Sequence, residues 1–167
     1  WLCLPYFDSP SVFAAILASL PAVDVRVIAF DTAVVDLTDA VEDPVDVLFG
    51  VQLGGGTDIN AAVAYCQQLI EQPTETVFVL ISDLLEGGVR TEMLRRFGQL
   101  VTSGVTAVAL LALSDTGKPT YDTDNAAALA ALGVPAFACT PDLFPELMAA
   151  AINRQDVARW AGDHGLV

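Results

Sequence analysis

The sequence predicts an α/β fold, with a doubly wound, mostly parallel, Rossmann-like sheet and helices on both faces. Two near-continuous apolar runs, residues 76–81 and 105–113, are typical of parallel strands that are covered on both faces. Stretches with apolar residues at helical spacing alternate with these runs along the chain. Hydrophobic residues make up 54% of the 167 residues, which favours one globular domain with a sizeable core.

Further strands are expected on either side of the two long runs. The first covers residues 2–7, where Pro5 indicates an edge strand, an irregularity or a break. Residues 25–30 are rich in β-branched side chains, and residues 34–37 form a short partner across a turn. A shorter strand over residues 135–139 comes last.

Helices are expected between these strands, over residues 12–20, 58–72, 91–103, 125–132 and 142–152. The second opens with an acidic residue, the third ends at a Ser-Gly pair, and the last follows a Thr-Pro start at Pro141. We therefore expect a domain over residues 1–152, followed by a C-terminal tail or short helix over residues 153–167.

The chain is strongly acidic, with 21 Asp and Glu residues against 7 Lys and Arg residues. Nucleic acids and anionic membranes bind dense basic surfaces, so both are poor partners for this chain. No apolar stretch reaches the length of a membrane span, and no secretory signal opens the sequence. Three separate cysteines argue against a disulfide framework and favour a reducing cytoplasm.

Three polar clusters fall at the expected carboxyl edge of the sheet, where ligand sites lie in such folds. Their candidate metal ligands are Asp8, Ser9 and Ser11 in the first cluster, Thr57 in the second and Asp83 in the third. Hydroxyls and carboxylates are hard oxygen ligands, which suit Mg²⁺, or else Mn²⁺ or Ca²⁺, better than zinc. The glycines before Thr57 allow close approach of the backbone to an ion, although they also fit a tight turn and helix cap.

Two nearby acids have structural interpretations. Asp58 is expected to be an acid of the first helical turn rather than a metal ligand. Asp31 is expected to end its strand through turn hydrogen bonds.

The segments LGGGTDINAAVAYC and VFVLISDLLEGG resemble the second and third motifs of von Willebrand factor type A (VWA) domains. The upstream segment VRVIAFDTAVVDLTD is similar to the second and third strands of that family. The resemblance extends from Ala22 to Pro145 and is nearest to the bacterial branch associated with MoxR-type AAA+ ATPases, which includes CoxE-like proteins.

The resemblance implies a metal-ion-dependent adhesion site, built from an Asp-x-Ser-x-Ser loop, a threonine and an aspartate. Thr57 and Asp83 match the last two elements, whereas the loop with Asp8, Ser9 and Ser11 is one residue shorter than the family pattern. Either this loop is shortened, or the sequence joins two segments that a longer loop separates in the family.

The resemblance predicts a protein-binding module rather than an enzyme. A partner protein supplies a Glu or Asp to the ion, and the expected partner is a MoxR-type AAA+ ATPase or its client, in complex assembly or metalloenzyme maturation. One alternative is a Mg²⁺-dependent phosphoryl-transfer domain, receiver-like or phosphatase-like, in which Lys118 would follow a late strand. The other is a metal-free scaffold with a decayed site.

Overall fold

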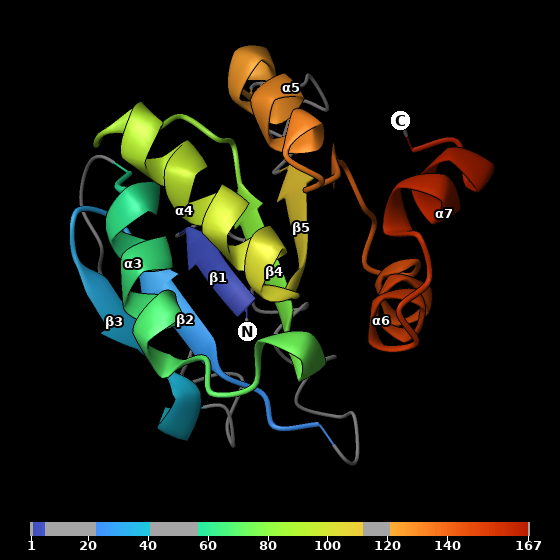
Figure 1. Cartoon of the computed structure of the whole chain (residues 1–167), viewed down its shortest axis with the longest axis horizontal. Helices are drawn as coiled ribbons and strands as arrows, with labels where there is room; N and C mark the ends of the chain where they lie inside the picture. The colour runs from blue at the N-terminus through green and yellow to red at the C-terminus, as the bar shows by residue number, and fades with distance from the viewer. Residues whose placement is uncertain (1, 6–22, 41–56, 112–120, 167) are drawn as a thin grey trace.

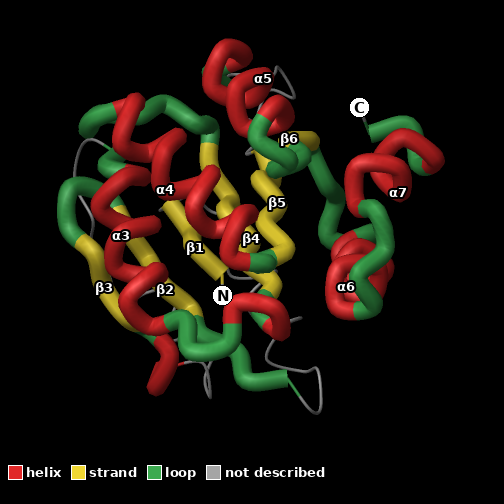
Figure 2. The backbone as a smooth tube through the Cα atoms, in the orientation of Figure 1, coloured by secondary structure: helices red, strands yellow, loops and turns green. Residues whose placement is uncertain are grey.

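The computed structural model describes residues 2–5, 23–40, 57–111 and 121–166. Within these ranges, six strands form one sheet in the order β3-β2-β1-β4-β5-β6 (Figure 2). The strands are β1 (Leu2–Pro5), β2 (Val27–Phe30), β3 (Val34–Asp36), β4 (Val77–Ser82), β5 (Thr106–Leu111) and β6 (Ala136–Phe137). Neighbouring strands are parallel, except that β3 is antiparallel to β2. The predicted mostly parallel α/β sheet is confirmed.

β1 lies in the interior of the sheet, so the interpretation of Pro5 as the mark of an edge strand is wrong. β1 pairs with β2 up to Pro5, opposite Phe30, but its register with β4 covers only Leu2 and Cys3. Proline has no N–H to donate, and Pro5 is tolerated because it is the last residue of β1, beyond the pairs shared with β4. Residues 6 and 7 of the expected strand lie outside the described residues.

The helices in the described ranges are α3 (Ile59–Leu69), α4 (Arg90–Ser103), α5 (Thr123–Ala131), α6 (Phe144–Ile152) and α7 (Val157–Asp163), with short 3₁₀ helices η1 (Thr38–Ala40) and η2 (Pro73–Glu75). The four predicted helices from residue 58 onward correspond to α3–α6. α6 begins later than expected, because Pro145 rather than Pro141 occupies its first turn. The expected helix over residues 12–20 lies outside the described residues. None of these helices has the length and apolar character that crossing a membrane requires.

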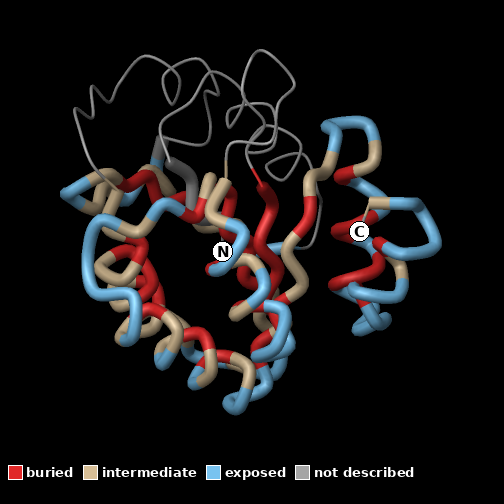
Figure 3. The backbone as a smooth tube through the Cα atoms, turned by 90° about the horizontal axis from the view of Figure 1, so that it is seen from above, coloured by how far each residue is buried: buried red, intermediate tan, exposed pale blue. Residues whose placement is uncertain are grey.

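The sheet carries a separate hydrophobic core on each face, because successive strand residues point to opposite sides. On β4, Phe78 and Leu80 belong to the core with α3, α4 and α5, whereas Val79 and Ile81 belong to the core with α6 and α7. Figure 1 shows α3 and α4 side by side across one face of the sheet. In Figure 3, burial is concentrated on the strands and on the inner sides of the helices. Helices on both faces are therefore confirmed.

α7 packs against the second core through Val157 and Ala161. Trp160, between them, lies 6.4 Å from Phe137 between ring centroids and stacks on His164 at 4.2 Å. The single histidine of the sequence is therefore an exposed residue at the end of α7, where it stacks on Trp160 and lies 3.5 Å from Oε2 of Glu146.

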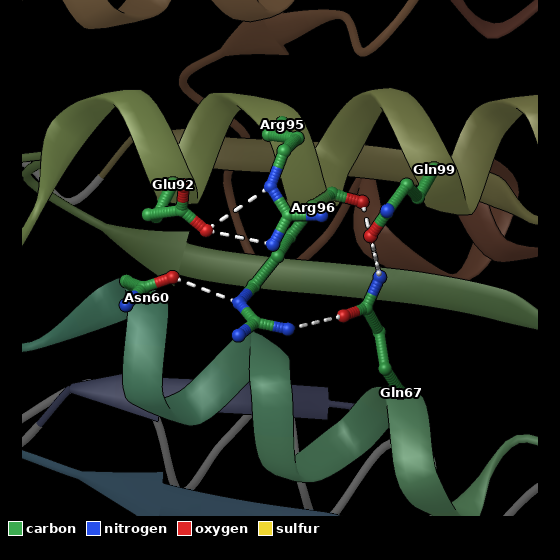
Figure 4. Close-up of polar contacts among 6 residues, drawn as sticks. All are labelled: Asn60, Gln67, Glu92, Arg95, Arg96 and Gln99. Atoms are coloured by element: carbon green, nitrogen blue, oxygen red, sulfur yellow. Dashed lines mark hydrogen bonds and ion pairs between the residues drawn. The ribbon is translucent and has the colours of Figure 1, made fainter.

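Polar side chains also join α3 to α4 (Figure 4). The Nε of Arg96 donates to Oδ1 of Asn60 at 2.9 Å, and its Nη1 donates to Oε1 of Gln67 at 2.9 Å. Gln67 in turn donates to the carbonyl of Arg96 at 3.2 Å. Arg96 thereby reaches both the first and the later turns of α3, which holds the two helices in register.

Replacing Phe97 with alanine should lower the free energy of unfolding by about 3–5 kcal/mol, the usual range for a buried phenylalanine. Phe97 is fully buried on α4, and its ring meets Phe78 edge to face with 5.9 Å between centroids. Denaturant-induced unfolding measures the loss. Leu132→Ala, at a side chain that is 37% exposed, is the control and should lose much less. Equal losses in the two variants would contradict this description of the core.

Candidate functional site

The start of α3 lies at the carboxyl edge of the sheet, held by the segments that follow β2 and β4. The N–H of Asp58 donates to the carbonyl of Asp31, directly after β2, at 2.8 Å. The carbonyl of Thr57 accepts the N–H of Gly87, in the loop after β4, at 2.6 Å. β1 lies between β2 and β4 and is the strand at which the strand order reverses. Thr57 and Asp58 therefore connect the segments that follow the two neighbours of β1. Ligands bind at such switch points in doubly wound sheets.

Asp83 directly follows β4 and is half-buried at the same edge. Its Oδ1 accepts the N–H of Leu85 at 3.0 Å, and its carbonyl accepts the N–H of Asp122 at 2.9 Å. Among the described residues, neither Oδ2 of Asp83 nor the hydroxyl of Thr57 has a hydrogen-bond partner. The structure thus brings Thr57 and Asp83 to one edge, on two segments that are bonded to each other through Gly87.

Leu84, the next residue, has an unusual backbone conformation. Its φ is 60°, in the left-handed region that a bulky side chain rarely adopts, and its side chain is fully buried. Its N–H donates to Oγ of Ser82 at 3.0 Å, and its carbonyl accepts Nδ2 of the buried Asn125 at 2.9 Å. Oδ1 of Asn125 accepts Nε of Arg90 at 2.6 Å. These contacts fix the backbone immediately after Asp83.

Glu86 joins the loop after β4 to α3, a role that sequence reasoning missed. Its Oε2 accepts the N–H of Ile59, the first residue of α3, at 2.9 Å, and its Oε1 accepts the N–H of Gly88 at 2.7 Å. Burial, followed by the nearby Asp58 carboxylate, raises the pKa of Glu86. An acid beside a helix N-terminus is favourable, but its partner is remote in sequence, so the sequence holds no local signal for this contact.

Gly87 and Gly88 allow the two segments to approach this closely. A Cβ at Gly87 would lie 2.8 Å from the Thr57 carbonyl oxygen, and one at Gly88 would lie 2.7 Å from Oδ1 of Asp58. Neither position has space for a side chain unless the backbone or the carboxylates move.

Of the two acids given structural roles, Asp31 behaves as expected, whereas Asp58 precedes the first turn of α3 instead of lying in it. Asp58 is the N-cap of α3, and its carboxylate accepts the N–H of Ala61 at 2.7 Å. Oδ1 of Asp31 accepts the N–H of Ala33 at 2.6 Å, which ends β2 in a turn. The other predicted ligands, Asp8, Ser9 and Ser11, lie outside the described residues, as do the three glycines before Thr57 and Lys118. Within the described ranges, no group of three or more His, Cys, Asp or Glu side chains is placed to hold a metal.

Gly87→Ala should destabilise the protein by about 1–3 kcal/mol, the usual cost of forcing extra atoms into a packed site. The added methyl group would collide with the Thr57 carbonyl. Gly98→Ala is the matched control, because its Cβ would meet only Leu132 at 3.8 Å, inside α4. The control should gain about 0.5–1 kcal/mol from its higher helix propensity. Thermal unfolding measures both, and a shift of the same sign in both variants would contradict the close contact at Gly87.

Comparison with known proteins agrees with this architecture. The uncharacterized protein YehP of Escherichia coli (strain K12) is 47% identical over 131 residues, or 78% of this chain, and this chain spans 35% of the length of that relative. The crystal structure of an aerotolerance-related membrane protein from Bacteroides fragilis NCTC 9343, with multiple mutations to serines, is similar in fold. It has a TM-score of 0.64 at 12% identity and covers 92% of this chain and 98% of that one.

Comparison of the sequence with known protein families identifies the family of this chain. Residues 10–148 match the family described as VWA domain containing CoxE-like protein. The match includes the start of α3 and the loop after β4, which carry Thr57 and Asp83. This chain therefore belongs to the CoxE-like proteins that contain a VWA domain.

Proposed function

We propose that this domain binds a partner protein through one divalent cation at the carboxyl edge of the sheet. The family supports a protein-interaction module in general, and the cation and its ligands are the proposed part. One observation carries the proposal: the segments that contain Thr57 and Asp83 meet at this edge, joined by the Gly87–Thr57 hydrogen bond of 2.6 Å.

The donor atoms suit a hard cation. Thr57 offers a hydroxyl and Asp83 a carboxylate that uses only Oδ1 to bind the Leu85 N–H. Oxygen ligands of this kind favour Mg²⁺, with Mn²⁺ or Ca²⁺ as alternatives. We propose that Asp8, Ser9 and Ser11 complete the site, because they follow β1, which lies between β2 and β4.

The bound ion would supply an electrophilic centre for a carboxylate of the partner. Only two of the five proposed ligands, Asp8 and Asp83, are anionic, so the ion would keep part of its positive charge. The role of the protein is to hold the hydroxyl and carboxylate oxygens in place, and binding requires no chemical turnover. We propose a MoxR-type AAA+ ATPase or its client as the partner, in complex assembly or metalloenzyme maturation. The separate cysteines suit a cytoplasmic location for this role.

Thr57→Val and Asp83→Ala should each weaken Mg²⁺ or Mn²⁺ binding at least tenfold, on the order of 1.4 kcal/mol. The first removes an oxygen ligand at nearly constant volume, and the second removes a negative charge. Calorimetric titration of the folded proteins measures the affinity. Thr57→Ser, which keeps the hydroxyl, and Thr102→Val, at an exposed position on α4, should bind metal like the parent. Unchanged affinity in both Thr57→Val and Asp83→Ala would refute the site.

The enzymatic alternative has a separate test. A receiver-like domain would transfer a phosphoryl group to a strand-end aspartate. Incubation with Mg²⁺ and acetyl phosphate, followed by intact-mass measurement, should leave the mass of this protein unchanged. A phosphorylated Asp83 would support the phosphoryl-transfer interpretation and contradict the binding module.

A further inference from the structure

We infer that the loop over residues 83–89, here the β4–α4 loop, is an apolar docking surface for a partner segment with a single carboxylate between aliphatic side chains. The inference rests on the proposed function, since the proposed cation beside this loop would bind that carboxylate. It adds a second, apolar contact that needs no metal, and it specifies aliphatic side chains on both sides of the partner's carboxylate.

The most exposed large apolar side chains of the described residues lie on this loop. Leu85 is 50% exposed and Val89 is 54% exposed, more than any other large apolar side chain in the described ranges. Single exposed apolar residues are common on protein surfaces and need no explanation. Leu85 and Val89 lie four positions apart on one short loop, directly after the candidate ligand Asp83, and this placement is the observation from which we infer a docking surface.

The fold does not require apolar residues at these two positions. Leu84 supplies the buried contact of this loop, and its left-handed backbone carries the chain from Leu84 in the core to Leu85 at the surface. Neither Leu85 nor Val89 belongs to the buried clusters on the two faces of the sheet. A polar residue at either position would therefore preserve the described core.

The loop is also held in place before any partner binds. The Asp83 carbonyl is bonded to the Asp122 N–H, the Leu84 carbonyl to Asn125, and the Glu86 carboxylate to the first N–H of α3. A surface that is already ordered loses little conformational entropy on binding, which favours affinity. Leu85 and Val89 are therefore presented on a fixed backbone.

Electrostatics restrict the kind of partner. The chain has a formal net charge of −14, which repels a segment rich in acidic residues. The proposed cation offers one local attraction for a carboxylate. Arg90, an exposed residue at the start of α4 whose Nε donates to Asn125, adds a positive charge beside the loop. The segment that fits both the charge and the apolar loop carries one Glu or Asp with aliphatic neighbours.

Three synthetic peptides labelled with a fluorophore test this inference by fluorescence anisotropy in Mg²⁺. The first has a single glutamate between leucines, the second has serines in place of the leucines, and the third has glutamine in place of the glutamate. The first peptide should bind most tightly. The serine and glutamine peptides should each bind at least fivefold more weakly, because each lacks one of the two contacts.

Protein variants then assign the apolar contact to the loop. Leu85→Ser and Val89→Ser should each weaken binding of the leucine peptide about five- to tenfold, as expected for burying the exposed half of an aliphatic side chain. Both should bind the serine peptide like the parent and keep the parent affinity for Mg²⁺. Ile152→Ser, at a side chain that is 43% exposed at the end of α6, is the matched control and should not change peptide binding.

The outcomes separate this inference from the proposed function. The docking surface would be overturned by any of three results: equal binding of the leucine and serine peptides, no binding of any peptide, or no effect of either loop variant. In each case, Mg²⁺ titration of the parent protein remains a separate test of the cation site. Loss of Mg²⁺ binding in Thr57→Val and Asp83→Ala, together with a leucine preference that depends on Leu85 and Val89, would support both.

Discussion

The carboxyl edge of this sheet depends on the hydrogen bonds between residues 57–59 and residues 86–88. Gly87 donates to Thr57, and the Glu86 carboxylate accepts the first N–H of α3 at Ile59. The first N–H groups of a helix have no partner within the helix, so α3 needs such contacts to begin here. Because the N–H of Asp58 is also bonded to Asp31, the start of α3 is held from both sides of β1.

The same edge contains a costly backbone conformation. A leucine in the left-handed region is strained, by roughly 1–3 kcal/mol, and persists only where its surroundings enforce it. At Leu84 this is achieved by complete burial and by two hydrogen bonds: the Leu84 N–H donates to Oγ of Ser82, and the Leu84 carbonyl accepts Nδ2 of Asn125. Asn125 belongs to α5, and the N-cap of α5, Asp122, is bonded to Asp83. The position of the candidate ligand is therefore coupled to the start of α5 as well as to α3.

The sheet explains why these contacts converge. The strand order reverses at β1, so the chain passes to β2 on one side and to β4 on the other. Loops that leave neighbouring strands at the reversal diverge and leave space for a ligand between them. The helices fill both faces of the sheet, and Arg96 holds α4 against α3 across one of them. The packing thus places the polar groups at the edge rather than over a face.

Much of this fold was predictable because its signals are local. The apolar runs of β4 and β5 reflect burial on both faces, and the periodicity of α3 reflects its packing against the sheet. Thr57 and Asp83 were identified as candidates because each lies next to the element that positions it. The Asp58 cap and the Asp31 turn likewise join residues two or three positions apart.

Only the tertiary structure decided the remaining features, since they depend on contacts between segments remote in sequence. Of the three interpretations of Pro5, the edge strand was wrong, because the effect of this proline depends on how far β4 runs beside β1, which no local pattern encodes. Glu86 gave no signal because its partner, Ile59, is 27 residues away. Asn125 reaches Leu84 across 41 residues. The sequence by itself determined which residues form strands, helices and oxygen donors, whereas the folded chain decided which of them meet, because hydrogen bonds and steric contacts act only between groups that the fold brings together.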